Sequence, residues 1–172
     1  MTADELITKI CTHAYTRAEV HRHLWLLRSY CERRWFGSGD AGTLASFYGQ
    51  EANPRGHAVA GDLGDDVGGL TKDTLYRVFD EAEELVKTLP FVAISIPFTP
   101  TDETIVAIGS WFRNNVNPRT VFEVTVDPRV VGGCAFAHRG YYQEFALHRA
   151  ITNKKEDIRS MLKDYADKET KQ

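Results

Sequence analysis

The hydrophobic positions in the first 36 residues recur every three or four residues, which is the spacing of one face of a helix. The apolar positions of two successive stripes are Leu6, Ile7 and Ile10, then Val20, Leu24, Leu27 and Cys31. Between the stripes, Thr16 and Glu19 have the T-x-x-E spacing of a capping box, in which both side chains satisfy amides at the start of a helix. We therefore predict a short first helix and a longer second helix that begins after Thr16.

The stretch 37–69 breaks this periodicity. It holds nine of the 13 glycines together with Pro54. Glycine weakens the interiors of both helices and strands, so we predict a loop here, apart from a short helix at 44–48. This glycine-rich linker is the predicted boundary between an N-terminal helical domain, residues 1–70, and a C-terminal domain, residues 71–172.

Helical periodicity returns after Thr71. Thr71 can cap a helix that Pro90 ends, and the apolar run 91–96 is typical of a buried strand. Thr99 and Pro100 then predict the start of another helix, because proline is tolerated at the first helical position. The residues expected on the core side of that helix are Ile105, Ile108, Trp111, Phe112 and Val116.

The remainder of the chain predicts three strands and a helical tail. Residues 122–126 alternate between apolar and polar, as in a half-buried strand. Two more strands are expected at 134–138 and 141–145, and the tail from Ala146 is expected to be helical. The apolar side of this tail carries Leu147, Ile151, Ile158, Leu162 and Tyr165. The predicted fold class is α+β: an N-terminal helical domain followed by a small mixed α/β C-terminal domain.

Composition narrows the function classes. Apolar residues make up 42% of the 172 and charged residues 26%, so we expect a packed core. A net charge of -3 gives the whole molecule no attraction to nucleic acid or anionic lipid. The three cysteines form no disulfide framework. No apolar stretch is long enough to cross a bilayer, and the first residues lack the regions of a signal peptide, so we expect no membrane insertion.

The candidates for catalysis or metal binding are weak. His21 and His23 are two residues apart, so on a helix they point in different directions. Cys134 and His138 would lie about 13 Å apart on one strand, too far for a nucleophile and its base. No zinc, calcium or nucleotide-binding motif is present. We predict no metal, no cofactor and no catalytic residue, although a small enzyme built around Cys134 or the histidines remains a rival hypothesis.

Arginine and aromatic residues alternate along the second helix. This mixture is typical of protein–protein hot spots and of single-stranded nucleic-acid sites. Because Glu32 lies nearby and the whole chain is negative, we favour a protein partner over nucleic acid. The predicted partner-binding residues are Leu24, Trp25, Arg28 and Trp35. A nucleic-acid-binding regulator that uses the helix 17–36 stays open as the alternative.

The stretch 122–136 contains a strand, then Asp127-Pro128, an apolar pair at Val130 and Val131, and Gly132-Gly133 before another strand. It resembles the C-terminal signature of the delta/OSCP subunits of F-type ATP synthases. The order of strand and helix in 91–116 also fits that family. The family motif residues in this chain are Asp127, Pro128, Val130, Gly132 and Gly133.

The resemblance implies a non-catalytic stator subunit that supports proton-driven ATP synthesis. The N-terminal half would bind the N-terminal segments of alpha subunits, and the C-terminal half would bind the b subunits of the peripheral stalk. It implies a peripheral location at the cytoplasmic face of the membrane, without direct insertion. A relative of the E-type stalk protein of V/A-type ATPases is a further alternative.

Overall fold

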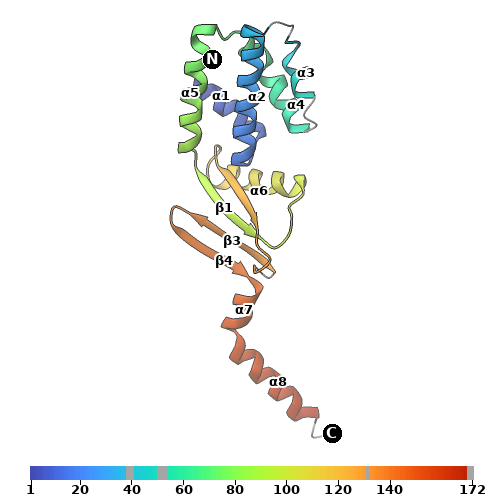
Figure 1. Ribbon diagram of the computed structural model, residues 1–172. Helices are drawn as coiled ribbons and strands as arrows, with labels where there is room; N and C mark the ends of the chain where they lie inside the picture. Colours follow the sequence, from blue (N-terminus) through green and yellow to red (C-terminus); the bar gives the residue numbers. More distant parts are fainter. Residues whose placement is uncertain (38–40, 50–53, 131, 170–172) are drawn as a thin grey trace. The chain divides into compact units, whose positions relative to one another are not determined.

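The computed structural model describes residues 1–37, 41–49, 54–130 and 132–169 (Figure 1). Helices and a four-stranded mixed sheet give it an α+β fold, which confirms the predicted class. The elements in chain order are α1 Ala3–His13, α2 Arg17–Phe36, α3 Leu44–Gly49, α4 Pro54–Gly68, α5 Lys72–Thr88, β1 Phe91–Ile96, α6 Asp102–Asn115, β2 Val121–Val126, β3 Gly133–His138, β4 Tyr141–Ala146, α7 Leu147–Asn153 and α8 Lys155–Glu169.

The chain forms two compact units, and the boundary between them differs from the one predicted at residue 70. The first unit comprises Met1–Val92 and Pro100–Glu123, and the second comprises Ala93–Thr99 and the chain from Val124 onward. Helix α5 belongs to the first unit because it packs against α1 and α2. Helices α5 and α6, which were predicted to lie in the C-terminal domain, therefore belong to the first, helical unit.

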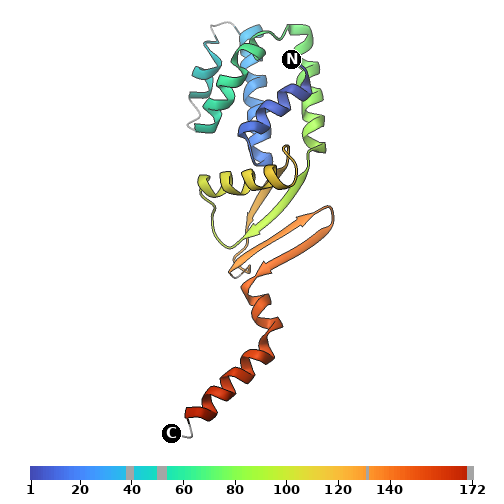
Figure 2. The ribbon, with the colours of Figure 1, turned by 180° about the vertical axis from the view of Figure 1, so that it is seen from behind.

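The core of the first unit confirms the first two predicted helices. Thr16 and Glu19 form the predicted capping box, with the Glu19 amide donating to Thr16 Oγ1 at 3.2 Å. Helix α1 packs against α2, α4 and α5, and the view from behind shows it crossing the bundle (Figure 2). The buried residues of the two helices include Leu6, Ile7, Ile10, Val20, Leu24, Leu27 and Cys31.

The loop predicted for most of 37–69 is wrong, because Pro54–Gly68 forms helix α4. Val59, Leu63 and Val67 lie four residues apart and are buried in the core shared with α1 and α2. Burying a side chain of this size contributes about 1.5–3 kcal/mol, which exceeds the helix penalty of about 1 kcal/mol for a glycine. The short helix predicted at 44–48 is confirmed as α3.

Helix α6 corrects a second prediction. It begins at Asp102 with Thr101 as its N-cap, two residues beyond the predicted start at Pro100. Trp111 is 57% exposed and Val116 is 55% exposed, so these two residues do not face a core. The helix packs through its one glycine instead, because Gly109 is buried against Tyr15.

The sheet has the strand order β2-β1-β3-β4. Strand β3 is antiparallel to both β1 and β4. Since the sheet is mixed, β1 and β2 run parallel, as expected for two strands joined through the crossover helix α6. The strand predicted at 91–96 and the hairpin predicted at 134–145 are thus confirmed. Among the residues described, no helix combines the length and apolar character that a bilayer crossing requires.

Candidate docking surfaces

A groove with acidic walls lies between α1 and α5 in the helical unit. Its volume is about 660 Å³, and its lining residues are Thr2, Ala3, Asp4, Asp80, Glu81, Glu84, Leu85 and Thr88. Four of these residues carry a carboxylate, while Ala3 and Leu85 offer apolar surface. The sequence analysis missed the groove, because its two sides come from segments about 80 residues apart.

The carboxylates at the groove are held in place by basic residues. Arg119 donates two hydrogen bonds to the Asp4 carboxylate, each at 2.7 Å. This contact with Arg119 lowers the pKa of Asp4 below its ordinary value. Lys87 approaches Glu84 at 2.6 Å in the same way. Asp4 and Glu84 are therefore each paired with a basic residue of the chain itself.

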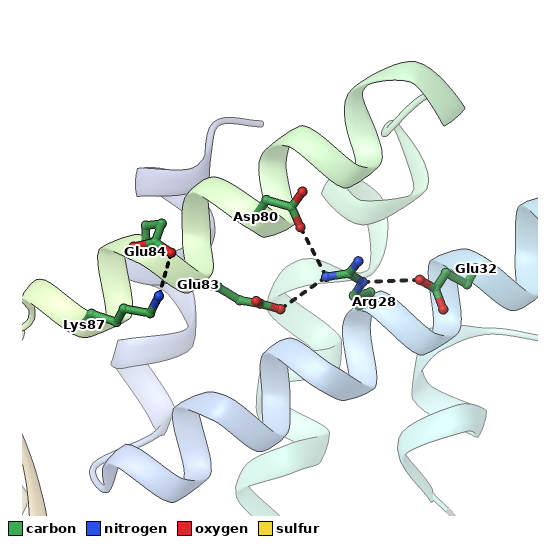
Figure 3. A network of polar contacts seen from close by, with 6 residues as sticks. All are labelled: Arg28, Glu32, Asp80, Glu83, Glu84 and Lys87. Atoms are coloured by element: carbon green, nitrogen blue, oxygen red, sulfur yellow. Dashed lines mark hydrogen bonds and ion pairs between the residues drawn. The ribbon is translucent and has the colours of Figure 1, made fainter.

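Arg28 joins α2 to α5 beside this groove (Figure 3). Its guanidinium lies 3.3 Å from Asp80 and 3.2 Å from Glu83, both on α5. It also lies 3.2 Å from Glu32 on its own helix. Arg28 was predicted to bind a partner, but its guanidinium instead forms ion pairs within the chain and connects α2 to α5.

The other predicted partner-binding residues differ in exposure. Trp25 is 64% exposed on α2 and is free to contact a partner. Trp35 is half-buried against the core, so only part of its ring is accessible. The prediction that Leu24 binds a partner is wrong. Leu24 belongs to the core, and a buried side chain cannot contact a partner while the helices stay packed. The helical spacing that groups Leu24 with Val20, Leu27 and Cys31 already indicates the buried side of α2.

The family-motif residues form the connection between β2 and β3. Asp127 accepts hydrogen bonds from the Arg129 amide and from the Arg129 guanidinium, each at 3.0 Å. These bonds lower the pKa of Asp127. The Val130 amide donates to the Asp127 carbonyl at 3.1 Å and closes a turn through Pro128. Val130 is buried, whereas Val131 lies outside the described residues.

Gly132 links this turn to the start of α7. Its φ is +65°, a left-handed conformation that favours glycine. Its carbonyl accepts a hydrogen bond from the Leu147 amide at 3.2 Å, and a Cβ at Gly132 would stand 3.0 Å from the Leu147 Cβ. Gly133 pairs with Ala146 at the end of the hairpin. The motif thus determines where the C-terminal helices begin.

Helices α7 and α8 carry an uncovered apolar stripe. Its members are Leu147, Ile151, Ile158, Met161 and Leu162, and their exposed fractions run from 39% to 65%. The spacing of three or four residues places Leu147 and Ile151 on one side of α7, and Ile158, Met161 and Leu162 on one side of α8. Met161 was not in the predicted set, and the side chain of Tyr165 lies outside what the structure describes. Apolar surface of this extent is typical of an interaction site.

The cysteines and histidines form no reactive cluster in the described part of the chain. Cys11 and Cys31 are buried, and burial raises the pKa of Cys31 to about 12, so this thiol stays protonated and unreactive at neutral pH. No group of three histidine, cysteine, aspartate or glutamate side chains among the described residues is placed to hold a metal ion.

Comparison of the chain with protein-family models and with curated proteins found no match. The fold and the surfaces above therefore define the class only as an α+β protein with an acidic groove and an exposed apolar helical tail.

Proposed function

We propose that the chain is a non-catalytic stator subunit of the delta/OSCP type, which links the catalytic head of an F-type ATP synthase to its peripheral stalk. The observation that carries the proposal is the uncovered apolar stripe of α7 and α8, which begins at Leu147, where the amide donates a hydrogen bond to the carbonyl of the motif glycine Gly132. A chain that exposes such a stripe works by binding another chain. The resemblance of 122–136 to the family signature supplies the identity of the complex.

The helical tail would bind the end of the b-type stalk subunit, which is itself helical in this family. Ile158, Met161 and Leu162 of α8 supply apolar positions at the spacing that a second helix needs for side-by-side packing. Charged residues flank the stripe, including Glu156, Arg159 and Lys163, and these can set the register of a partner helix. This arrangement favours a helical occupant over a flat globular surface.

The groove between α1 and α5 would hold the N-terminal segment of an alpha subunit. Grooves with apolar floors bind amphipathic helices through a few apolar anchors. The three carboxylates of one wall, Asp80, Glu81 and Glu84, already form ion pairs within the chain. The bound segment should therefore dock mainly through apolar residues that pack on Ala3 and Leu85. The two proposed contacts lie on separate units, as a linking protein requires.

The proposed location follows from the proposed partners. A protein attached to the head and the stalk would be peripheral at the cytoplasmic face of the membrane, held there by other chains.

Co-purification tests the proposal directly. A tagged full-length chain, expressed in its own host and solubilised from native membranes, is expected to retain both alpha and b subunits. The double substitution Ile158→Asp and Leu162→Asp alters only exposed residues of α8, so it should leave the fold intact. We expect it to abolish retention of the b subunit and to leave retention of alpha unchanged.

A control places an aspartate on the other side of α8. Ser160→Asp lies between the two substituted positions in sequence but off the apolar stripe, and it should retain both subunits. Loss of neither subunit in the double variant would contradict the assignment of the stripe. Failure of the wild-type chain to retain alpha and b would overturn the proposed function itself.

A further inference from the structure

A continuous series of stacked cations and rings joins α2 to α5 at the ends of these helices, and we name it the cation–aromatic ladder. Its members in order are Arg28, Tyr76, Phe36, Lys72, Trp35 and Arg34. Cation-to-ring distances run from 5.2 to 6.0 Å, and the Phe36 and Tyr76 rings stack at 6.2 Å. Cation–π contact is effective up to about 6 Å, so each neighbour in the series stabilises the next.

The ladder is open to solvent along much of its length. Phe36, Tyr76, Lys72 and Arg34 are all exposed, and Arg28 and Trp35 are half-buried. Arg33, also exposed, follows on the same helix end. Within the part of the chain that the structure describes, Arg28 forms ion pairs, whereas Arg33, Arg34 and Lys72 form none. Arg34 and Lys72 therefore present positive charge beside exposed rings, with Arg33 next to Arg34 in sequence, and none of the three forms an ion pair among the described residues.

The rings of the ladder are poor platforms for nucleic-acid bases. Base stacking requires an open aromatic face. Lys72 covers Phe36, Arg28 covers Tyr76, and the two rings cover each other. A partner can reach the ring edges and the cationic groups, but it cannot insert a base between them. This geometry favours carboxylates and small apolar side chains over single-stranded DNA or RNA.

We infer that the cation–aromatic ladder is a docking site for an acidic peptide segment of a partner protein. Carboxylates of the segment would bind Arg33, Arg34 and Lys72, and an apolar residue would pack against the exposed edge of Phe36. The rings hold Lys72 and Arg34 in place before binding, which lowers the entropy that the complex must lose. The lining of the groove between α1 and α5 carries carboxylates and no lysine or arginine among the described residues, so an acidic segment would not bind there. The inference does not depend on the proposed stator function.

Fluorescence anisotropy with the full-length chain tests the inference. The probe is a labelled synthetic peptide of alternating glutamate and leucine, and the reference is the same peptide with glutamine in place of glutamate. We expect only the glutamate peptide to bind, with an affinity that falls as salt is added. The substitution pair Arg34→Gln and Lys72→Gln should weaken binding by about tenfold, from the loss of two exposed charge pairs.

Lys87→Gln is the matched control, because it removes an exposed lysine from the other end of α5. It should bind the probe like the wild type, and circular dichroism should show the same helix content for all variants. Equal binding of the glutamine peptide, no binding of the glutamate peptide, or equal weakening by Lys87→Gln would overturn the inference. Tighter binding of oligothymidylate or of phosphatidylserine vesicles through Arg34 and Lys72 would also overturn it.

Discussion

The backbone of Gly109 lies against the ring of Tyr15, so that a Cβ built on the glycine would stand 2.1 Å from the Tyr15 Cδ1 atom. On the same ring, the Arg113 guanidinium lies 4.0 Å from the centroid. Arg113 also donates to the carbonyl of Thr12 at 2.9 Å and to that of Ala14, at the C-terminal end of α1. Helix α6 therefore docks on the connection between α1 and α2 through one glycine and one arginine.

Gly109→Ala should destabilise the helical unit by about 1–3 kcal/mol or more, because the added methyl group overpacks the contact with Tyr15. Urea denaturation followed by circular dichroism would measure the change in the free energy of unfolding. Tyr15→Ala in the same background should recover part of the loss. An unchanged free energy of unfolding in Gly109→Ala would contradict the close packing of α6.

Gly61→Ala should have the opposite effect. Gly61 lies in the exposed part of α4, and a Cβ there would meet nothing within 4 Å. Alanine is favoured over glycine in a helix interior by about 1 kcal/mol, so we expect stabilisation of up to that amount. The same urea titration measures it. A destabilised Gly61→Ala variant would contradict the assignment of 54–68 as a helix.

Helix α4 shows what the sequence could and could not predict. The caps, stripes and proline stops of α1, α2 and α5 act within a few residues, so they can be read locally. In α4 the density of glycine obscured the spacing of Val59, Leu63 and Val67, and only burial against other helices makes that spacing decisive.

The docking surfaces also differ in how far the sequence alone could predict them. The apolar side of the tail was predictable because Ile151, Ile158 and Leu162 have helical spacing in one continuous segment. The acidic groove depends on two helices that meet only in the fold, as does the packing of Gly109 against Tyr15. The exposure of Trp111 likewise depends on which neighbours its helix acquires.

His23 gives the helical unit a predictable response to acid. The side chain is 3% exposed, its ring stacks on Tyr48 at 5.7 Å, and its Nδ1 has no hydrogen-bond partner among the described residues. Burial is the main cause that lowers the pKa of His23 to about 4. The nearby Glu19 opposes this shift, whereas Arg22, Arg55 and His13 add to it.

Because the pKa of His23 is about 4 in the folded protein and about 6.5 in the unfolded chain, the unfolded chain binds the additional proton first. His23 therefore contributes fully to the free energy of unfolding above about pH 6.5. This contribution, about 3 kcal/mol in total, is lost as the pH falls towards 4. Urea titrations across this range measure it. His23→Phe should remove the pH dependence between 6.5 and 4, while His57→Gln, at an exposed position, should keep it.

Arg28→Gln should weaken the connection between α2 and α5. The variant loses the ion pairs to Asp80, Glu83 and Glu32, which are partly exposed, so we expect a loss of about 1 kcal/mol. The difference from the wild type should shrink at high salt, because salt screens exposed charges. Thermal unfolding at low and high salt measures both effects. A loss that does not depend on salt would instead point to the packing of the Arg28 stem on Tyr76.

Gly132→Ala should disturb the start of α7 more than Gly140→Ala disturbs the hairpin turn. Both glycines have positive φ, +65° and +84°, so alanine costs about 1–2 kcal/mol of backbone strain at either position. Only at Gly132 does the new Cβ also approach Leu147, at 3.0 Å, whereas Gly140 has nothing within 4 Å. Hydrogen exchange at the Leu147 amide, which donates to the Gly132 carbonyl, should therefore accelerate in Gly132→Ala and stay unchanged in Gly140→Ala. Equal exchange in the two variants would mean that the motif glycine serves the turn alone and does not direct the helical tail.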